Sequence, residues 1–116
     1  MKKFINNNDD FLKESLTGFG KAHSDIINVN LDPSFVSRKN KTKDGKVSLI
    51  SGGGSGHEPM HGGFVGHGML DAACPGFVFS APTPDQMQAA AEHVDSGAGV
   101  LFCLLYTSPS PRDKHR

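Results

Sequence analysis

The stretch from residue 51 to residue 61, SGGGSGHEPMH, gathers residue types that carry chemistry. Its glycines let backbone amides approach a ligand closely, at φ angles that other residues avoid. Its two histidines can transfer protons or bind a metal, and the glutamate between them can act as a base. This composition suits a phosphate loop, a zinc site or a pocket for another small ligand.

A phosphate loop fits the spacing poorly, because the essential lysine is missing. The pattern G-x-x-x-x-G-K-[ST] places a lysine on the phosphates and a hydroxyl on magnesium. In this chain His57 stands five positions after Gly52, where that pattern has its second glycine. The dinucleotide pattern G-x-G-x-x-G also lacks its last glycine. The glycines therefore favour a small polar ligand over a nucleotide.

The zinc interpretation has a formal match, since His57, Glu58 and His61 spell H-E-x-x-H and His67 stands where a third ligand would fall. The chemistry needs both histidines one turn apart on a single helix. Pro59 disfavours the helical region for the residue before it, so the two histidines should not share a helical face. We expect no metal here and keep two alternatives, a zinc hydrolase and a plain structural turn.

Apolar runs predict the strands that position this stretch, at residues 46–51, 76–80 and 99–102. The first run leads directly into the glycines, which places the glycine loop at the C-terminal edge of a strand. Residues 59–73 can form a helix that its glycines weaken. Residues 27–46 are predicted to be extended pieces and loop, with their basic residues on a solvated face.

Two helices have clearer signals. Thr83 and Gln86 have the spacing of a capping box, with Pro84 at the first helical position, which predicts a helix that ends near Val94. Apolar residues at helical spacing predict an amphipathic helix over residues 9–21, with one of the two aspartates at its start as N-cap.

The order of these elements predicts an α/β fold with a partial parallel sheet and flanking helices. In such sheets ligands bind beyond the C-terminal ends of the strands. The glycine loop is predicted to lie at that edge. Position and composition therefore both indicate a ligand site.

Composition sets the class of protein and its partners. The chain has 116 residues, enough for one domain, and its 12 Lys plus Arg balance 12 Asp plus Glu. Without an overall positive field we expect no nucleic-acid partner. The sequence has no apolar run of about 18 residues and no secretion signal, so we expect no membrane anchor. Two cysteines form no disulfide framework, which makes the cytoplasm the expected compartment.

The longer motifs carry a resemblance to a known family. The stretch ISGGGSGHEPMHGGFVGHGML at residues 50–70, APTPDQM at residues 81–87 and the opening MKKFINN resemble the N-terminus of dihydroxyacetone kinase. The similarity is to its substrate-binding K subunit or K domain and extends from residue 1 to about residue 101. It implies that the chain is the N-terminal part of a larger K-domain fold.

The resemblance implies roles for four residues. Gly54, Ser55, Gly56 and His57 match the family's contacts with dihydroxyacetone, and His57 also matches its general acid/base. An imidazole near its ordinary pKa can take a proton from a substrate hydroxyl at neutral pH. No metal ligand is implied, and a metabolite-binding module without chemistry is the other alternative to the kinase.

Other parts of the enzyme are implied to lie elsewhere. The family's nucleotide, ATP or ADP with magnesium, belongs to a separate L domain or subunit, and a homodimer of the complete K subunit is compatible with the resemblance. A lysine, an aspartate and a covalently binding histidine of the family lie beyond the matched segment. We therefore expect this chain alone to be inactive as a kinase.

The tail departs from the family pattern. Residues 103–113, CLLYTSPSPRD, resemble the translation of a transposase adapter that is used to build sequencing libraries. We therefore interpret residues 1–102 as part of the K domain and residues 103–116 as adapter read-through without function.

Overall fold

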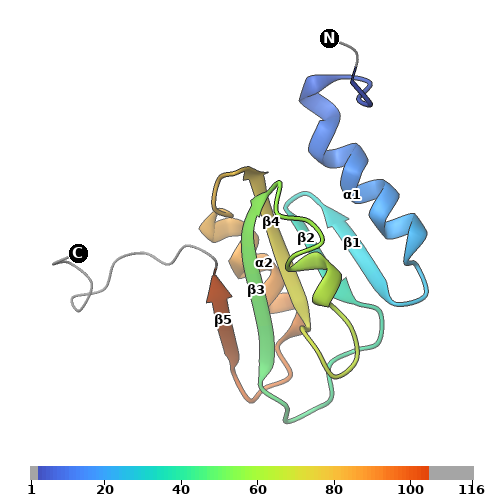
Figure 1. The fold of residues 1–116 in the computed structure, drawn as a ribbon. Helices are drawn as coiled ribbons and strands as arrows, with labels where there is room; N and C mark the ends of the chain where they lie inside the picture. The colour runs from blue at the N-terminus through green and yellow to red at the C-terminus, as the bar shows by residue number, and fades with distance from the viewer. Residues whose placement is uncertain (1–2, 105–116) are drawn as a thin grey trace, which may run out of the picture.

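The structure is a computed structural model that describes residues 3–104 (Figure 1). Its elements, in chain order, are η1 (Asn8–Asp10), α1 (Phe11–Ala22), β1 (Ile27–Leu31), β2 (Ser34–Arg38), β3 (Ser48–Ser55), η2 (Gly62–Phe64), β4 (Ala72–Val78), α2 (Pro84–Val94) and β5 (Val100–Leu104). The adapter interpretation of the tail falls mostly outside the described residues, and only its first two residues belong to β5.

The strands form one mixed sheet in the order β1-β2-β4-β3-β5. Both β4 and β5 run parallel to β3, with Gly52 opposite Cys74 on one side and Leu104 on the other. This arrangement confirms the predicted α/β fold with a partial parallel sheet. Figure 1 shows that β3 is flanked by β4 and β5, so the segment that follows β3 emerges at the centre of the parallel part.

The hairpin of β1 and β2 is an addition that the sequence pattern did not predict. The two strands pair antiparallel, from Ile27 opposite Arg38 to Leu31 opposite Ser34, and β2 continues the sheet antiparallel to β4. The expected extended pieces are these two strands, but their pairing as a hairpin was not predicted. The strands are only five residues each, and β2 is buried on both faces, so its residues do not alternate between apolar and polar.

The predicted helix over residues 59–73 is also absent. This segment consists of turns and the short helix η2, and β4 already begins at Ala72. Gly68 at φ 79° and His61 at φ 65° have backbone conformations that no α-helix contains. The dense glycines therefore stop the helix that the spacing of apolar residues indicated.

Strand β3 extends further than predicted. It runs from Ser48 to Ser55, so Gly52, Gly53 and Gly54 pair with β4 as part of the sheet. The loop begins only at Gly56, whose φ of 112° is in the region that favours glycine. These three glycines thus belong to the last part of β3, and the loop begins one residue before His57.

The capping signal of α2 is confirmed. The Thr83 hydroxyl accepts a hydrogen bond from the Gln86 amide at 3.3 Å, and the Gln86 side chain accepts one from the Thr83 amide at 2.9 Å. At the start of α1, Asp10 occupies the N-cap position as predicted, but its side chain makes no capping bond. Asn7 caps the preceding η1 instead, where its side chain accepts from the Asp9 amide.

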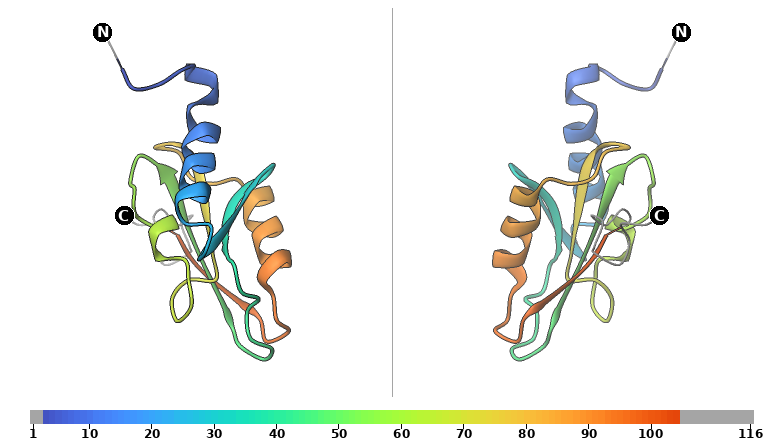
Figure 2. Two further views of the ribbon diagram at one scale, coloured as in Figure 1. Left: turned by 90° about the vertical axis from the view of Figure 1, so that its right-hand side faces the viewer. Right: turned by 90° about the vertical axis from the view of Figure 1, so that its left-hand side faces the viewer.

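The helices cover opposite faces of the sheet, as the two side views in Figure 2 show. Successive residues of a strand point to opposite faces. Phe35 accordingly packs in the core under α2, and its neighbour Val36 packs in the core under α1. The residues of the two cores are Phe35, Ile50, Ala72, Cys74, Ala90 and Val94 on the α2 side, and Leu16, Ile27, Val36, Val65 and Ala73 on the α1 side.

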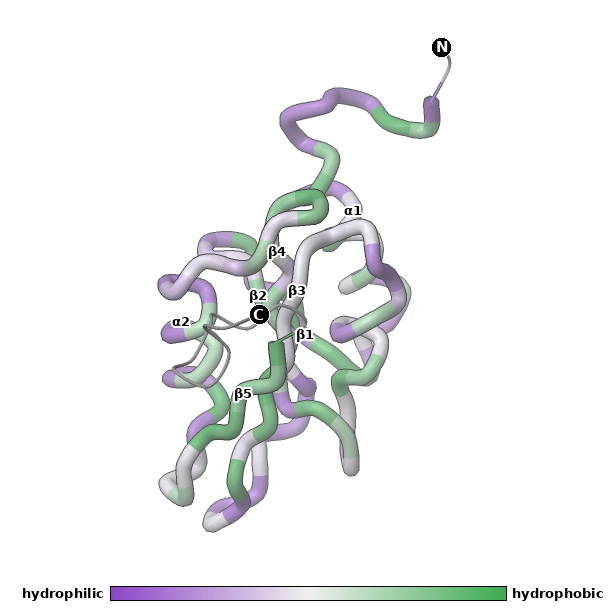
Figure 3. Tube along the Cα trace, turned by 60° about the vertical axis from the view of Figure 1, so that its left-hand side comes forward, coloured by the Kyte–Doolittle hydropathy of each residue, from purple (hydrophilic) through white to green (hydrophobic). Residues whose placement is uncertain are grey.

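Hydropathy follows these layers. Figure 3 shows hydrophobic residues along the strands and polar residues on the outer helix surfaces and in the turns. Some large apolar side chains remain exposed, notably Phe77, Phe79 and Leu101. Within residues 3–104, the helices are all too short or too polar to cross a bilayer.

Candidate functional site

His57 lies just beyond the C-terminal end of β3, at the edge where ligands of parallel sheets bind. Its side chain is half-buried, and its Nε2 is buried without a hydrogen-bond partner among residues 3–104. One side of the imidazole contacts the Phe79 ring, with ring centroids 5.3 Å apart and planes at 87°. An imidazole with a sheltered, unpaired nitrogen can bond or deprotonate a ligand hydroxyl.

Glycines of β3 and β4 make room for the chain that follows β4. A Cβ on Gly54 would lie 2.6 Å from the Ser80 amide nitrogen, and one on Gly76 would clash with the Ser80 carbonyl oxygen. Both glycines are therefore required by the close approach of backbone rather than by an unusual φ. The segment around Phe79 and Ser80 therefore packs closely against the end of the parallel strands.

The other two predicted contact residues already have partners within the chain. The buried Ser55 hydroxyl donates to the Gly76 carbonyl at 2.8 Å, which ties β3 to β4. The Gly56 amide donates to the Glu58 carboxylate at 2.8 Å. The structure thus brings Gly54, Ser55, Gly56 and His57 together at one edge, and their contacts with a substrate remain a prediction.

His61 holds the loop to the sheet from the α1 side. Its Nδ1 lies 2.6 Å from the Ser51 hydroxyl, while its Nε2 is buried without a partner among the described residues. Burial, and then the nearby charge of His57, hold the pKa of His61 below its ordinary value. His61 is therefore neutral at physiological pH.

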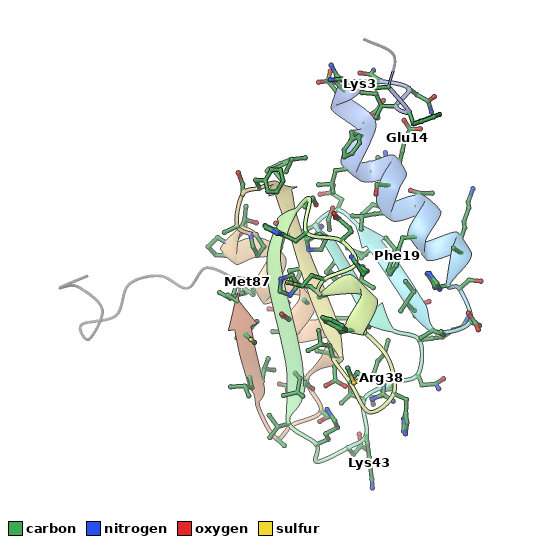
Figure 4. The ribbon with its side chains drawn as sticks, in the orientation of Figure 1. Lys3, Glu14, Phe19, Arg38, Lys43 and Met87 are labelled. Atoms are coloured by element: carbon green, nitrogen blue, oxygen red, sulfur yellow. The ribbon has the colours of Figure 1, made fainter. Side chains whose placement is uncertain are left out.

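A cavity of about 150 Å³ opens beside this loop, between α1 and the sheet. Apolar side chains of α1, such as Leu16 and Phe19, form one wall, and Phe19 is labelled in Figure 4. Gly53, Gly54 and His61 form part of the other wall. The cavity therefore borders the candidate site at Gly54.

The geometry gives the zinc alternative no support. His57 to His61 form turns rather than a helix, as the effect of Pro59 predicted. Among residues 3–104, no three His, Cys, Asp or Glu side chains are grouped closely enough to hold a metal. The buried Cys74 is no nucleophile either, because burial raises the pKa of its thiol to about 12.

The sequence did not predict a buried ionic cluster, which lies at the N-terminal end of the parallel strands, away from His57. Asp71, fully buried just before β4, accepts hydrogen bonds from Lys46 Nζ at 2.6 Å, the Leu49 amide at 2.7 Å, Thr42 Oγ1 at 3.0 Å and Arg38 Nη1 at 3.3 Å. Arg38, labelled in Figure 4, also reaches His67 Nδ1 at 3.1 Å. The expectation that this basic run only forms a solvated face was wrong for Arg38 and Lys46.

The charge balance of this cluster is favourable. Burial alone would raise the pKa of Asp71, but the hydrogen bonds from Lys46, Leu49, Thr42 and Arg38 outweigh it and hold the pKa below its ordinary value. Asp71 therefore stays ionised and fastens the loop before β3 to the starts of β3 and β4. A lone aspartate between glycine-rich segments gives no sequence signal for this role.

Fold and site together define an α/β domain with a glycine-rich strand end and a histidine at the C-terminal edge of its parallel strands. The chain belongs to the Dak1 domain family, whose model matches residues 17–108. The resemblance to dihydroxyacetone kinase is thereby confirmed at the level of the family.

Individual relatives agree with this assignment. The chain is 51% identical over 104 residues to the dihydroxyacetone-binding subunit DhaK of the PEP-dependent dihydroxyacetone kinase of Escherichia coli. The aligned segment covers 90% of this chain and 29% of the relative. It is 48% identical over 103 residues to the corresponding subunit of the PTS-dependent kinase of Lactococcus lactis, with 89% and 31% covered. The chain thus spans less than a third of the length of these relatives.

A solved structure shows the same fold. The dihydroxyacetone kinase of C. freundii, crystallised with AMP-PNP and Mg²⁺, superimposes with a TM-score of 0.79 at 37% identity and covers 87% of this chain and 19% of that one. This agreement supports the mixed α/β fold.

The role of Gly54 can be tested by stability alone. A methyl group in Gly54→Ala must displace Ser80 or Phe79 backbone, and we expect a loss of about 1–3 kcal/mol in the free energy of unfolding. Gly18, in the middle of α1, has nothing within 4 Å of its Cβ direction, so Gly18→Ala should be neutral or stabilising by up to about 1 kcal/mol. Urea unfolding of both variants measures the difference, and equal stabilities would contradict the close approach.

Proposed function

We propose that the protein carrying this segment binds dihydroxyacetone and presents one of its hydroxyls for phosphorylation. The observation that carries the proposal is the buried, unpartnered Nε2 of His57 at the C-terminal edge of β3, in a chain of the Dak1 family. Relatives named as dihydroxyacetone-binding subunits support the choice of substrate.

In this proposal His57 is the general acid/base. Its Nε2 accepts the proton of the substrate hydroxyl as that oxygen attacks the phosphoryl group, and the imidazolium is then the conjugate acid. Gly54, Ser55, Gly56 and His57 line the substrate. The other side of the site, with further contacts, belongs to segments outside this chain, so this chain alone is inactive.

The phosphoryl donor belongs to a partner in this proposal. ATP or ADP with magnesium is held by a separate L domain or subunit, and this segment binds no cofactor itself. The AMP-PNP and Mg²⁺ in the C. freundii kinase are consistent with a nucleotide donor, whereas the names of the bacterial subunits refer to PEP or the PTS. The protein is further proposed to act in the cytoplasm, and its K subunit to form a homodimer.

We also maintain the proposal that residues 1–102 belong to the K domain and residues 103–116 are adapter read-through. The family match extends to residue 108, across the proposed junction. An independent genomic read across codons 102 and 103 decides whether the tail belongs to the gene.

The function is tested with the complete protein and its nucleotide-bearing partner. We expect dihydroxyacetone phosphate, detected by ³¹P NMR, only when both proteins, a phosphoryl donor and dihydroxyacetone are present. A protein that holds dihydroxyacetone but never phosphorylates it would instead be a binding module. Stoichiometric zinc that is lost in His61→Ala would overturn the kinase in favour of the hydrolase.

A further inference from the structure

Backbone strain in this chain is concentrated beside His57. Among residues 3–104 only His61, at φ 65°, and Phe79, at φ 53°, have positive φ without being glycine. A positive φ is uncommon for any side chain and a true outlier for a bulky one. Such conformations persist where the surrounding structure enforces them, and they gather at functional sites.

Phe79 is the more unusual of the two, because it occupies a turn position that normally belongs to glycine. The Ser80 amide donates to the Phe77 carbonyl at 2.9 Å, which closes a four-residue turn with Phe79 in third place. Turns with positive φ at this place take glycine or asparagine. The Phe79 amide also donates to the Ser55 carbonyl at 2.7 Å, which fixes the turn to the end of β3.

Burial does not explain a phenylalanine at this place, since 68% of Phe79 is exposed. Its ring instead contacts the two residues that follow β3. It meets the His57 imidazole edge-on at 5.3 Å, and a Cβ on Gly56 would lie 2.7 Å from its Cζ. Edge-to-face pairs at this separation are attractive and have a preferred orientation. The ring is thus placed to restrict the rotation of His57.

We propose that Phe79 is a positioning residue that orients the His57 imidazole for proton transfer. The inference rests on the proposed function of His57. The strained turn holds the ring against the imidazole, so that Nε2 keeps one direction while the substrate hydroxyl approaches. Small errors in the placement of a catalytic group lower the rate strongly.

The key variant is Phe79→Gly in the complete protein, because glycine relieves the turn and removes the ring. We expect an unchanged or higher melting temperature, a kcat about tenfold lower, and a KM for dihydroxyacetone within about twofold of the wild type. Phe79→Tyr keeps the ring and should retain kcat within about twofold. Phe77→Leu is the matched control, since Phe77 is equally exposed at 70% and lies in the same turn, and its kcat should not change.

A double-mutant cycle shows whether Phe79 acts through His57. In the His57→Ala background, Phe79→Gly should lower kcat no further, because the group that it orients is gone. An equal loss in both backgrounds would overturn the proposal, as would an effect on KM alone. Failure of Phe79→Gly to fold would overturn it too, because the ring would then be structural.

NMR of the histidine rings gives a readout that does not require kinase activity. Loss of the Phe79 ring current should move the His57 imidazole signals, while those of His93, which packs on Phe35, stay in place. Unmoved His57 signals would refute the contact and with it the proposal. A protein in which they move but which never phosphorylates dihydroxyacetone would refute the function of His57, and therefore also the role of Phe79 in proton transfer.

Discussion

Replacing His57 by alanine in the complete protein is expected to lower kcat for dihydroxyacetone phosphorylation by about 10²- to 10⁴-fold, the range for loss of a positioned acid/base. The reason is that Nε2 of His57, at the C-terminal edge of the parallel strands, is buried without a hydrogen-bond partner among residues 3–104. Alanine leaves water to accept the proton. Steady-state kinetics with the nucleotide-bearing partner in excess measures the change.

A histidine away from the edge provides the control for this variant. His23 caps the C-terminus of α1 and is exposed, so His23→Ala should leave kcat within about twofold. Circular dichroism should show the same fold for both variants. Turnover of His57→Ala at more than half of the wild-type value would remove its role as acid/base.

The second large effect is expected at Asp71, where alanine would leave Arg38 and Lys46 without their counter-ion. Asp71 is fully buried, and Arg38 has only 8% of its side chain exposed. Removing one partner of a buried ion pair destabilises a protein by about 3–5 kcal/mol. Urea unfolding of the complete protein should show this loss, whereas Asp44→Ala, which breaks a fully exposed pair with Lys41, should show no measurable change.

The Asp71 carboxylate also makes the stability of the protein depend on pH in the acidic range. The pKa of Asp71 is lower in the folded than in the unfolded chain, so its contribution is complete above the unfolded value of about 3.9 and is lost as the pH falls through the folded value. The wild type should therefore lose stability below about pH 4, and Asp71→Asn should show a flatter profile there. A parallel decline in both proteins would contradict the proposed pairing.

Local chemistry explains which elements could be predicted. Helix α2 is set by contacts between Thr83 and Gln86, three residues apart, so the sequence pattern contains them. The segment over residues 59–73 has apolar residues at helical spacing, but Gly68 and His61 adopt positive φ, which an α-helix does not contain. Tertiary packing decided the conformation there, and a single sequence does not display it.

The distinction between local and long-range contacts also applies to the candidate site. His57 and the glycines could be predicted because they are contiguous and of unusual composition. Phe79 could not, because its role depends on a contact with a loop more than twenty residues earlier in the chain, at His57. Asp71 is similar, since its partners Arg38 and Lys46 lie far from it in the sequence. The pairing of β4 with both β3 and β2 brings such groups together.

Chemical modification of the buried Cys74 can report how often the sheet opens. The Cys74 thiol lies in the core under α2 with no exposed surface, and burial raises its pKa, so it is unreactive while the core is closed. Alkylating reagents will therefore modify Cys74 only when β3 and β4 separate from α2. The rate of this modification measures how often the sheet and α2 come apart in the native protein.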